Sequence, residues 1–298
     1  MVSRRSSTGL VRTRVGVAVL ALVVLTAITM AVAPSAVATP ARYTGGVYVA
    51  MGDSRASGGF FSPTPDYFLG CKRSAFNYPS IVAVMTLPRR FIDTSCAGAQ
   101  APDLHRHAQR TNRGIKPPQV NLVPRDAQVI TVSIGGNDMR WGAILVRCNA
   151  APLTDRRCRH NPGLEQEVRW RIDRMENRVT PALRAIRARA PRAQIIVVGI
   201  GGFMGSHGCW PMVPVSDPGV RWMNRVFDRA GQALGRATAK VGGVFIDANR
   251  RSAGHDPCNL VAPWYESSLS NGSLAYPYHI NQQGAVAIAS MVNGAIRR

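Results

Sequence analysis

The chain has 298 residues, of which 46% are hydrophobic and 18% charged. Those proportions suffice for a globular core and exclude an intrinsically disordered protein. The formal net charge of +21 favours anionic surfaces, namely phospholipid head groups, acidic cell-wall polymers or nucleic acid.

The first 38 residues have the three parts of an export signal. Arginines precede an apolar run over residues 15–32, and Ala36-Val-Ala38 follows as a small-residue cleavage site. The pattern predicts a secreted protein whose mature part, residues 39–298, forms one domain. The apolar run, roughly 18 residues long, also fits an uncleaved membrane anchor. Without the four arginines of the signal, 33 basic residues remain against 16 acidic ones, a net charge of +17.

Strand and helix patterns alternate along the mature part. Short apolar or β-branched runs predict strands over residues 47–51, 91–95, 128–134, 194–199 and 244–247. Helices are predicted over residues 77–87, 163–190, 217–240 and 282–296. The segments 97–125, 148–162 and 248–278 are predicted to be irregular, the first with a helical piece. This alternation predicts one domain with a parallel sheet covered by helices on both faces.

Small and polar residues follow three of these strands directly. Gly-Asp-Ser54 ends the first strand, Cys-Ala-Gly98 follows the second, and Gly-Gly-Asn137 follows the third. The carboxyl ends of parallel strands form the edge where ligands bind. A serine there suits a nucleophile, although Gly-Asp-Ser alone is also an ordinary turn. A glycine lets a backbone N–H approach a ligand, and an asparagine offers an amide donor to an oxyanion. His279, just before the last helix, completes the set.

In order and spacing these motifs resemble the SGNH hydrolases, a branch of the GDSL esterases and lipases whose four blocks carry Ser, Gly, Asn and His. The resemblance runs from about residue 47 to residue 290, and it rests on Gly52-Asp-Ser54, Gly98, Gly135-Gly-Asn-Asp138 and His279. It implies an α/β fold, a three-layer α/β/α sandwich with a five-stranded parallel flavodoxin-like sheet. It also implies hydrolysis of carboxylic esters through an acyl-enzyme, with no metal and no cofactor.

The resemblance gives each matched residue a role. Ser54 is the nucleophile, and His279 is the base that takes its proton. The N–H groups of Ser54 and Gly98 and the side chain of Asn137 form the oxyanion hole.

The residue that orients His279 does not follow the family pattern, whose last block is usually Asp-x-x-His. Here Tyr276 stands where that aspartate is expected. We predict that the backbone carbonyl of Tyr276 holds the imidazole and gives a Ser-His dyad. A carboxylate from the preceding loop, Asp256 or Glu266, is the alternative and would complete a triad.

Six cysteines lie in the exported part, where disulfides persist. They allow 15 pairings, of which we predict the nearest neighbours in sequence. The predicted bridges are Cys71–Cys96, Cys148–Cys158 and Cys209–Cys258. The six also resemble the three-bridge pattern of the secreted actinobacterial members. Zinc is the weaker alternative, because no Cys-x-x-Cys occurs. For the same reason of missing ligands we predict no metal at His105 and His107.

The sequence leaves the substrate open between acyl esters of lipids and acetyl groups on polysaccharides. Four tryptophans are candidates for the acyl pocket, namely Trp141, Trp210, Trp222 and Trp264; the pair Trp264-Tyr265 is the one we favour. Arg55 is either a contact for an acidic substrate group or a solvated side chain. A non-catalytic basic surface-binding protein is the alternative of another class. We expect a monomer, association with an anionic membrane or cell wall, and no nucleic-acid partner, because arginines scattered over helices are not a nucleic-acid footprint.

Overall fold

The computed structural model of the chain describes residues 40–58, 70–148, 158–269 and 275–298. The predicted signal, residues 1–38, lies outside these ranges, so its cleavage stays a prediction. Within them, no helix combines the length and the apolar character that crossing a membrane requires.

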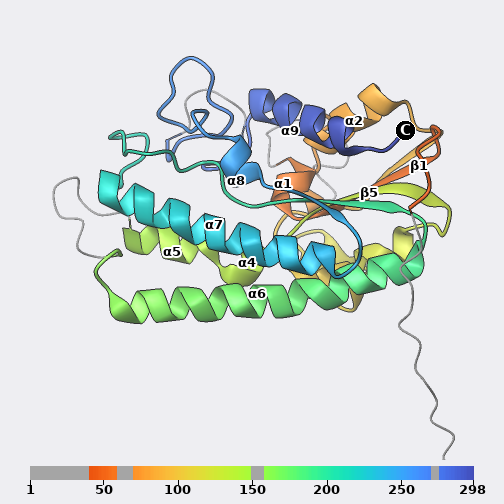
Figure 1. Cartoon of the computed structure of the whole chain (residues 1–298), viewed down its shortest axis with the longest axis horizontal. Helices are drawn as coiled ribbons and strands as arrows, with labels where there is room; N and C mark the ends of the chain where they lie inside the picture. Colours follow the sequence, from red (N-terminus) through yellow and green to blue (C-terminus); the bar gives the residue numbers. More distant parts are fainter. Residues whose placement is uncertain (1–39, 59–69, 149–157, 270–274) are drawn as a thin grey trace, which may run out of the picture. The chain divides into compact units, whose positions relative to one another are not determined.

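A five-stranded parallel sheet runs through the described domain (Figure 1). Its strands, in spatial order, are β2 (Arg90–Asp93), β1 (Val47–Gly52), β5 (Ala127–Ser133), β6 (Gln194–Val198) and β7 (Val244–Ile246). The five predicted strands are confirmed to within a few residues. Every residue of β1 and β6 is buried, because a parallel sheet is covered on both faces.

Helices form the two outer layers. One face of the sheet carries α2 (Tyr78–Thr86) and α9 (Gln282–Ala295), and the other carries α6 (Pro162–Arg189) and α7 (Asp217–Ala239) (Figure 1). The three-layer α/β/α sandwich predicted from the sequence is confirmed. In α6 the residues spaced by three and four are buried against the core, namely Leu164, Val168, Ile172, Met175, Val179, Leu183 and Ile186.

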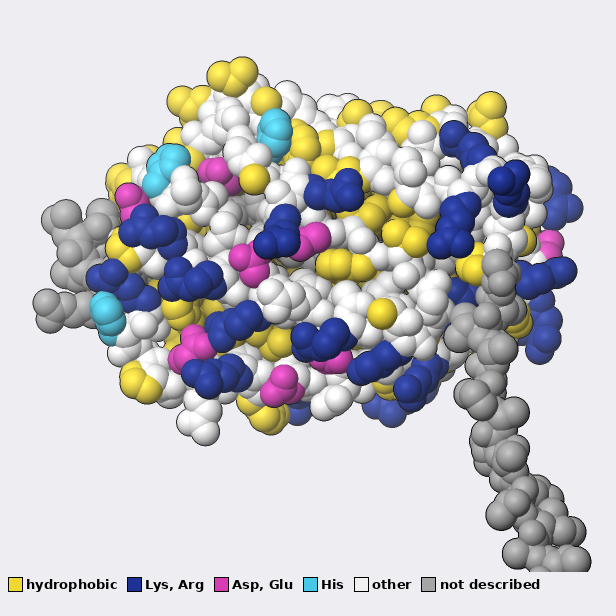
Figure 2. Space-filling model, viewed as in Figure 1, with side chains coloured by type: hydrophobic (Ala, Val, Ile, Leu, Met, Phe, Trp, Pro, Cys, Tyr) yellow, Lys and Arg dark blue, Asp and Glu magenta, His cyan; other side chains and the backbone are white. Residues whose placement is uncertain are grey.

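The outward face of α6 and α7 carries a spread of Lys and Arg side chains mixed with acidic ones (Figure 2). Several of them form ion pairs between the two helices. Glu176 pairs with Arg236 at 2.6 Å and with Lys240 at 3.0 Å, and Glu165 pairs with Arg229. Exposed pairs of this kind contribute little each, about 0–1 kcal/mol. This face is therefore a solvated, charge-paired surface.

Among the described residues, eight short elements lie outside the predicted helices and strands. They are α1 (Ser54–Ser57), α3 (Ala101–His105), β3 (Gln109–Thr111), β4 (Gly114–Lys116), η2 (Gln119–Leu122), α4 (Gly136–Met139), α5 (Trp141–Cys148) and α8 (Ala248–Arg251). The prediction of a helical piece within residues 97–125 is confirmed by α3. The antiparallel hairpin β3–β4 in the same segment was not predicted, because three-residue strands are too short to show an alternating pattern.

The strand order reverses between β1 and β5. The chain leaves β1 through α2 on one face, and it leaves β5 through α6 on the other. Such a switch point is where open α/β sheets bind ligands. At this edge Gly52 has φ +135°, and a Cβ there would lie 2.1 Å from the carbonyl oxygen of Ser133. Only glycine fits where β1 passes so close to its neighbour.

Two of the three predicted disulfides are formed. Cys71–Cys96 ties the segment before α2 to the turn after β2, and Cys209–Cys258 joins the loops that follow β6 and α8. Cys148 and Cys158, the third predicted pair, are both buried, and their bridge stays a prediction. These two residues flank residues 149–157, which lie outside the described ranges.

Candidate active site

Ser54 and His279 meet at the carboxyl edge of the sheet. Ser54 is the first residue of α1, two positions after the end of β1, and His279 lies three residues before α9. The Nε2 atom of His279 is 2.8 Å from the Oγ atom of Ser54. A base must be within this distance to take a proton from a serine hydroxyl. The structure thus brings together the two predicted catalytic residues, which are 225 positions apart in the chain.

A backbone carbonyl faces the other nitrogen of the imidazole. The Nδ1 atom of His279 is 2.9 Å from the carbonyl oxygen of Pro277. When Nε2 accepts the serine hydroxyl, Nδ1 carries the proton and donates it to this oxygen. The prediction that the Tyr276 carbonyl holds the imidazole is wrong. That carbonyl accepts the backbone N–H of His279 at 3.0 Å instead. Tyr278 closes this turn with φ +58°, and the Pro277 carbonyl then faces the imidazole ring.

Asp256 and Glu266, the alternative residues for orienting His279, make other contacts. Asp256 accepts the backbone N–H of Cys258 at 3.0 Å with its Oδ1 atom. Glu266 contacts the histidine turn through its backbone, with its N–H donating to the carbonyl of His279 at 2.9 Å. The hydrogen-bond partner of His279 Nδ1 is therefore the Pro277 carbonyl rather than a carboxylate.

The surroundings of His279 favour the neutral imidazole. Burial lowers the pKa of His279, the carbonyl of Pro277 raises it, and the charge of Arg55 lowers it again, for a net decrease. A histidine with a lowered pKa is unprotonated at neutral pH. It is then in the state that a general base needs.

Three groups are candidates for receiving a developing oxyanion. The backbone N–H groups of Ser54 and of the exposed Gly98 donate to no acceptor within the described residues. Asn137, on α4, donates one amide hydrogen to the carbonyl of Ala99 at 2.9 Å, which leaves its second hydrogen for a ligand. Asn137 lines the same small cavity as Ser54 and His279.

The segment that carries Gly98 is tied down on several sides. Ala97 donates its N–H to the carbonyl of Cys71 at 2.9 Å, next to the Cys71–Cys96 bridge. On the other side, Asp138 accepts the N–H of Ala101 at 2.9 Å. Burial raises the pKa of the Asp138 carboxyl, which lies 3.5 Å from Arg178 on α6. Backbone and side chains from three elements thus hold the predicted oxyanion donor.

Gln119 is a site residue that the sequence did not indicate. It is buried in η2, and its amide makes two hydrogen bonds to the backbone of Gly52. The Oε1 atom accepts the Gly52 N–H at 2.8 Å, and Nε2 donates to the Gly52 carbonyl at 2.9 Å. Gln119 therefore fixes the backbone two residues before the serine. It lies in a segment predicted as irregular, with no periodic pattern to single it out.

Asp53, between Gly52 and Ser54, braces the turn that carries the serine. Its Oδ1 atom accepts the N–H of Arg55 at 2.9 Å and caps α1. Burial is the main cause that raises the pKa of Asp53 to about 7, against the opposing effects of Arg55. A carboxyl oriented toward the backbone in this way positions the turn rather than the histidine.

Aromatic rings form one wall of the cavity beside Ser54. Phe203 lies 4.9 Å from Trp141 and 5.7 Å from Tyr278, measured between ring centroids. All three rings line the cavity, together with Ile200 and Phe227. This apolar wall suits an acyl chain.

Of the four candidate tryptophans, Trp141 is the one at the cavity. The prediction that Trp264 lines the acyl pocket is wrong. Its ring stacks on His255, with centroids 3.8 Å apart, and it is not among the residues that line the cavity. Trp222 is buried and donates to Glu165 at 3.1 Å, and Trp210 is 63% exposed. Tyr265 is fully buried under the Arg55 guanidinium. A stacking partner such as His255 leaves no trace in sequence spacing.

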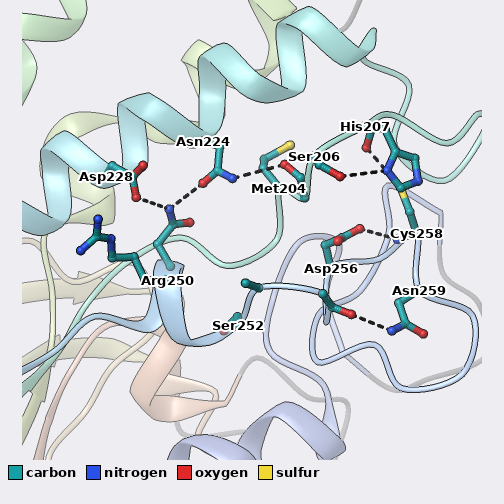
Figure 3. A pocket seen from close by; sticks show the side chains of 14 residues that line it. Met204, Ser206, His207, Asn224, Asp228, Arg250, Ser252, Asp256, Cys258 and Asn259 are labelled. Atoms are coloured by element: carbon teal, nitrogen blue, oxygen red, sulfur yellow. Dashed lines mark hydrogen bonds between the residues drawn. The ribbon is translucent and has the colours of Figure 1, made fainter.

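A second, larger cavity of about 560 Å³ lies between α7, α8, the loop that follows β6 and the loop that follows α8 (Figure 3). Most residues that line it are polar, and several of their side chains form hydrogen bonds with one another. The Nδ2 atom of Asn249 donates to Asn224 at 2.6 Å and to Asp228 at 2.9 Å. None of the residues matched to the four family blocks lines this cavity. The chemistry therefore belongs to the smaller, partly aromatic one.

The fold and this geometry define a class, a serine hydrolase built on a flavodoxin-like parallel sheet. The sequence model of the GDSL-like Lipase/Acylhydrolase family matches residues 50–287. The chain belongs to this family and is a carboxylic ester hydrolase.

Known relatives agree with this assignment. Lipase 2 of Streptomyces coelicolor A3(2) is 31% identical over 266 residues, which cover 83% of this chain and 85% of that protein. A lipase of Streptomyces rimosus is 28% identical over 250 residues, with the same two coverages. The crystal structure of the extracellular lipase from Streptomyces rimosus superimposes with a TM-score of 0.66 at 25% identity, covering 84% of this chain and 99% of that one. Phospholipase A1 from Streptomyces albidoflavus NA297 shares the fold, with a TM-score of 0.67 at 20% identity over 86% of this chain and all of that one.

Proposed function

We propose that the protein is an exported esterase that cleaves acyl esters of lipids with a Ser54–His279 dyad. The observation that carries the proposal is the 2.8 Å contact between Ser54 Oγ and His279 Nε2, with Nδ1 held by the Pro277 carbonyl. The lipid substrate is supported by the aromatic wall of the cavity and by relatives that are named lipases.

In the first half of the reaction, Ser54 Oγ attacks the ester carbonyl while His279 Nε2 takes its proton. The negative charge that develops on the carbonyl oxygen is received by the N–H groups of Ser54 and Gly98 and by the amide of Asn137. The intermediate then collapses. The bond to the alcohol breaks, the imidazolium gives its proton to the leaving alkoxide, and the acyl group stays on Ser54.

In the second half, a water molecule takes the place of the alcohol. His279 removes a proton from the water, and the hydroxide attacks the acyl carbonyl of the acyl-enzyme. The same three donors stabilise the second oxyanion. Collapse breaks the bond to Ser54 Oγ, which regains a proton from His279, and the carboxylic acid leaves. The pair returns to its starting state with no cofactor required.

Hydrolysis of 4-nitrophenyl esters from acetate to palmitate tests this function. We expect turnover by the wild type and none above background by Ser54→Ala. Ser57→Ala is a matched control, because Ser57 is a buried serine of the same helix whose hydroxyl has no hydrogen-bond partner within the described residues. The chain-length optimum separates a lipase from an acetylesterase. Turnover retained by Ser54→Ala would contradict the proposed nucleophile.

We also propose that the chain is exported, is cleaved after residue 38 and acts as a monomer at an anionic membrane or cell-wall surface. The net charge of +17 on residues 39–298 supports the attraction to such a surface. N-terminal sequencing of protein from the culture medium tests the cleavage. A product that stays in the membrane fraction with residue 1 intact would indicate an anchor instead.

A further inference from the structure

Arg55, the residue directly after the nucleophile, is held over the catalytic cavity. Its Nη1 atom donates to the carbonyl of Gly201 at 3.3 Å, and its Cζ atom lies 5.8 Å from the centroid of the Tyr265 ring. Its backbone N–H is fixed by Asp53. The guanidinium lines the same cavity as Ser54 and His279. A charged group is thus placed within the cavity that receives the ester.

One edge of this guanidinium is not used by the protein. The Nε and Nη2 atoms of Arg55 are buried, and neither has a hydrogen-bond partner within the described ranges. In the same ranges no carboxylate lies within salt-bridge distance of Arg55. Burying charged donors without an acceptor is costly, so such groups in a folded protein need an explanation. Surface solvation, the simpler expectation for Arg55, leaves these two donors without an acceptor.

The geometry of that edge selects an anion. Nε–H and Nη2–H of an arginine point the same way and form the fork that binds two oxygens of a carboxylate or phosphate. Besides Asp53, Ser54, Asn137 and His279, the residues that line the cavity with Arg55 are glycines or large apolar and aromatic residues. Such surroundings strengthen an interaction with a charged oxygen. The excess of positive charge over the whole molecule also attracts anionic substrates.

We propose that the Nε and Nη2 donors of Arg55 bind a negatively charged oxygen of the substrate, so that the enzyme prefers esters with a phosphate or carboxylate near the scissile bond. This inference rests on the proposed function, because it assigns the substrate of the same site. Arg55 is then a specificity-determining residue. The anionic group has two sources, a phosphate on the alcohol side, as in a phospholipid, or a carboxylate at the end of the acyl group.

Two matched pairs of esters separate these sources. Dihexanoyl phosphatidylcholine against dihexanoylglycerol, both below their micelle concentrations, tests a phosphate on the alcohol side. The mono-4-nitrophenyl ester of adipic acid against 4-nitrophenyl hexanoate tests a carboxylate on the acyl side. The readout is the ratio of kcat/KM between the charged and the neutral member of each pair. It is measured for the wild type, Arg55→Met and Arg55→Lys.

We expect the wild type to favour the charged member of at least one pair. In Arg55→Met the kcat/KM for that member falls roughly 10- to 100-fold more than for its neutral partner, since a charge-assisted, two-point contact is lost. Arg55→Lys keeps the charge without the fork and recovers part of the preference. Arg174→Met is the charge-matched control, because Arg174 is exposed over Trp170 on α6, away from the cavity; it leaves both ratios unchanged.

Three results would overturn the inference. The first is a wild type with the higher kcat/KM on the neutral member of both pairs. This result needs no variant, so it remains available if Arg55→Met fails to fold. An Arg55→Met variant that loses the same factor on all four esters shows a general catalytic or structural role. A variant with unchanged ratios shows no contact. If the wild type hydrolyses none of the esters, the proposed function itself fails, which is a distinct outcome.

Discussion

The dyad can be tested by removing the carboxylates that a triad would need. Asp256→Asn keeps the shape of the side chain and the Oδ1 atom that accepts the Cys258 N–H. Because Nδ1 of His279 is 2.9 Å from the Pro277 carbonyl, the change removes no partner of the imidazole. We expect kcat to stay within about threefold of the wild type, a change of about 0.6 kcal/mol in the activation free energy.

A triad predicts a very different magnitude. Replacing an orienting aspartate by asparagine lowers kcat about 10⁴-fold in a serine protease triad, which corresponds to about 5.4 kcal/mol. The two expectations differ by more than three orders of magnitude, so the assay needs little precision. Steady-state hydrolysis of 4-nitrophenyl butyrate at pH 8 is sufficient, with His279→Ala as the variant that loses activity in either case.

The same measurement applies to Glu266→Gln, the other carboxylate of the preceding loop. Tyr276→Phe completes the set, because Tyr276 contacts the imidazole turn through its carbonyl, which the substitution keeps. A loss of 100-fold or more in Asp256→Asn or Glu266→Gln, with the thermal transition unchanged, would refute the dyad. That result would mean that the carbonyl of Pro277 gives way to a carboxylate when substrate binds.

Other parts of the site give three further expectations. Asn137→Ala lowers kcat roughly 100- to 1000-fold with little change in KM, because it removes an oxyanion donor; a loss expressed only in KM would contradict this role. The acid limb of the kcat/KM profile lies below pH 6.5, since activity needs neutral His279 and its pKa is lowered; Arg55→Met removes one cause and moves the limb to higher pH. Gln119→Ala lowers the free energy of unfolding by about 2–4 kcal/mol, because it leaves the buried Gly52 N–H unpaired and opens a cavity; urea denaturation measures it, and a change below 1 kcal/mol would count against the clamp.

The sequence predicts the sheet well because its strands are buried on both faces. Such strands are continuous apolar runs that end at small residues, so both their length and their ends are visible. Residues a short way past the ends of β1 and β5 then come to the site with the strands, as Ser54 and Asn137 do. The long amphipathic helix α6 is equally visible through its spacing of three and four.

Features decided by side-chain contacts and single dihedral angles were not predictable. The carbonyl that faces His279 differs from the expected one by a single residue, because the turn at Tyr278 takes a left-handed conformation. Gln119 reaches Gly52 across 67 positions of the chain, and no pattern in either segment announces the contact. Trp264 was favoured for the cavity by its place in the loop, but stacking on His255 takes its ring elsewhere.

The groups of the proposed oxyanion hole are held in place by contacts within the protein. Donors stabilise a transition state well when they are oriented before the charge appears. Reorienting them during the reaction would require free energy that offsets the stabilisation. Here the Gly98 segment is fixed by a disulfide at Cys96 and by Asp138 at Ala101, while Asn137 is fixed by the carbonyl of Ala99. Because Asn137 and Asp138 are neighbours on α4, the same short helix carries the proposed side-chain donor and fixes the segment of the proposed backbone donor, Gly98.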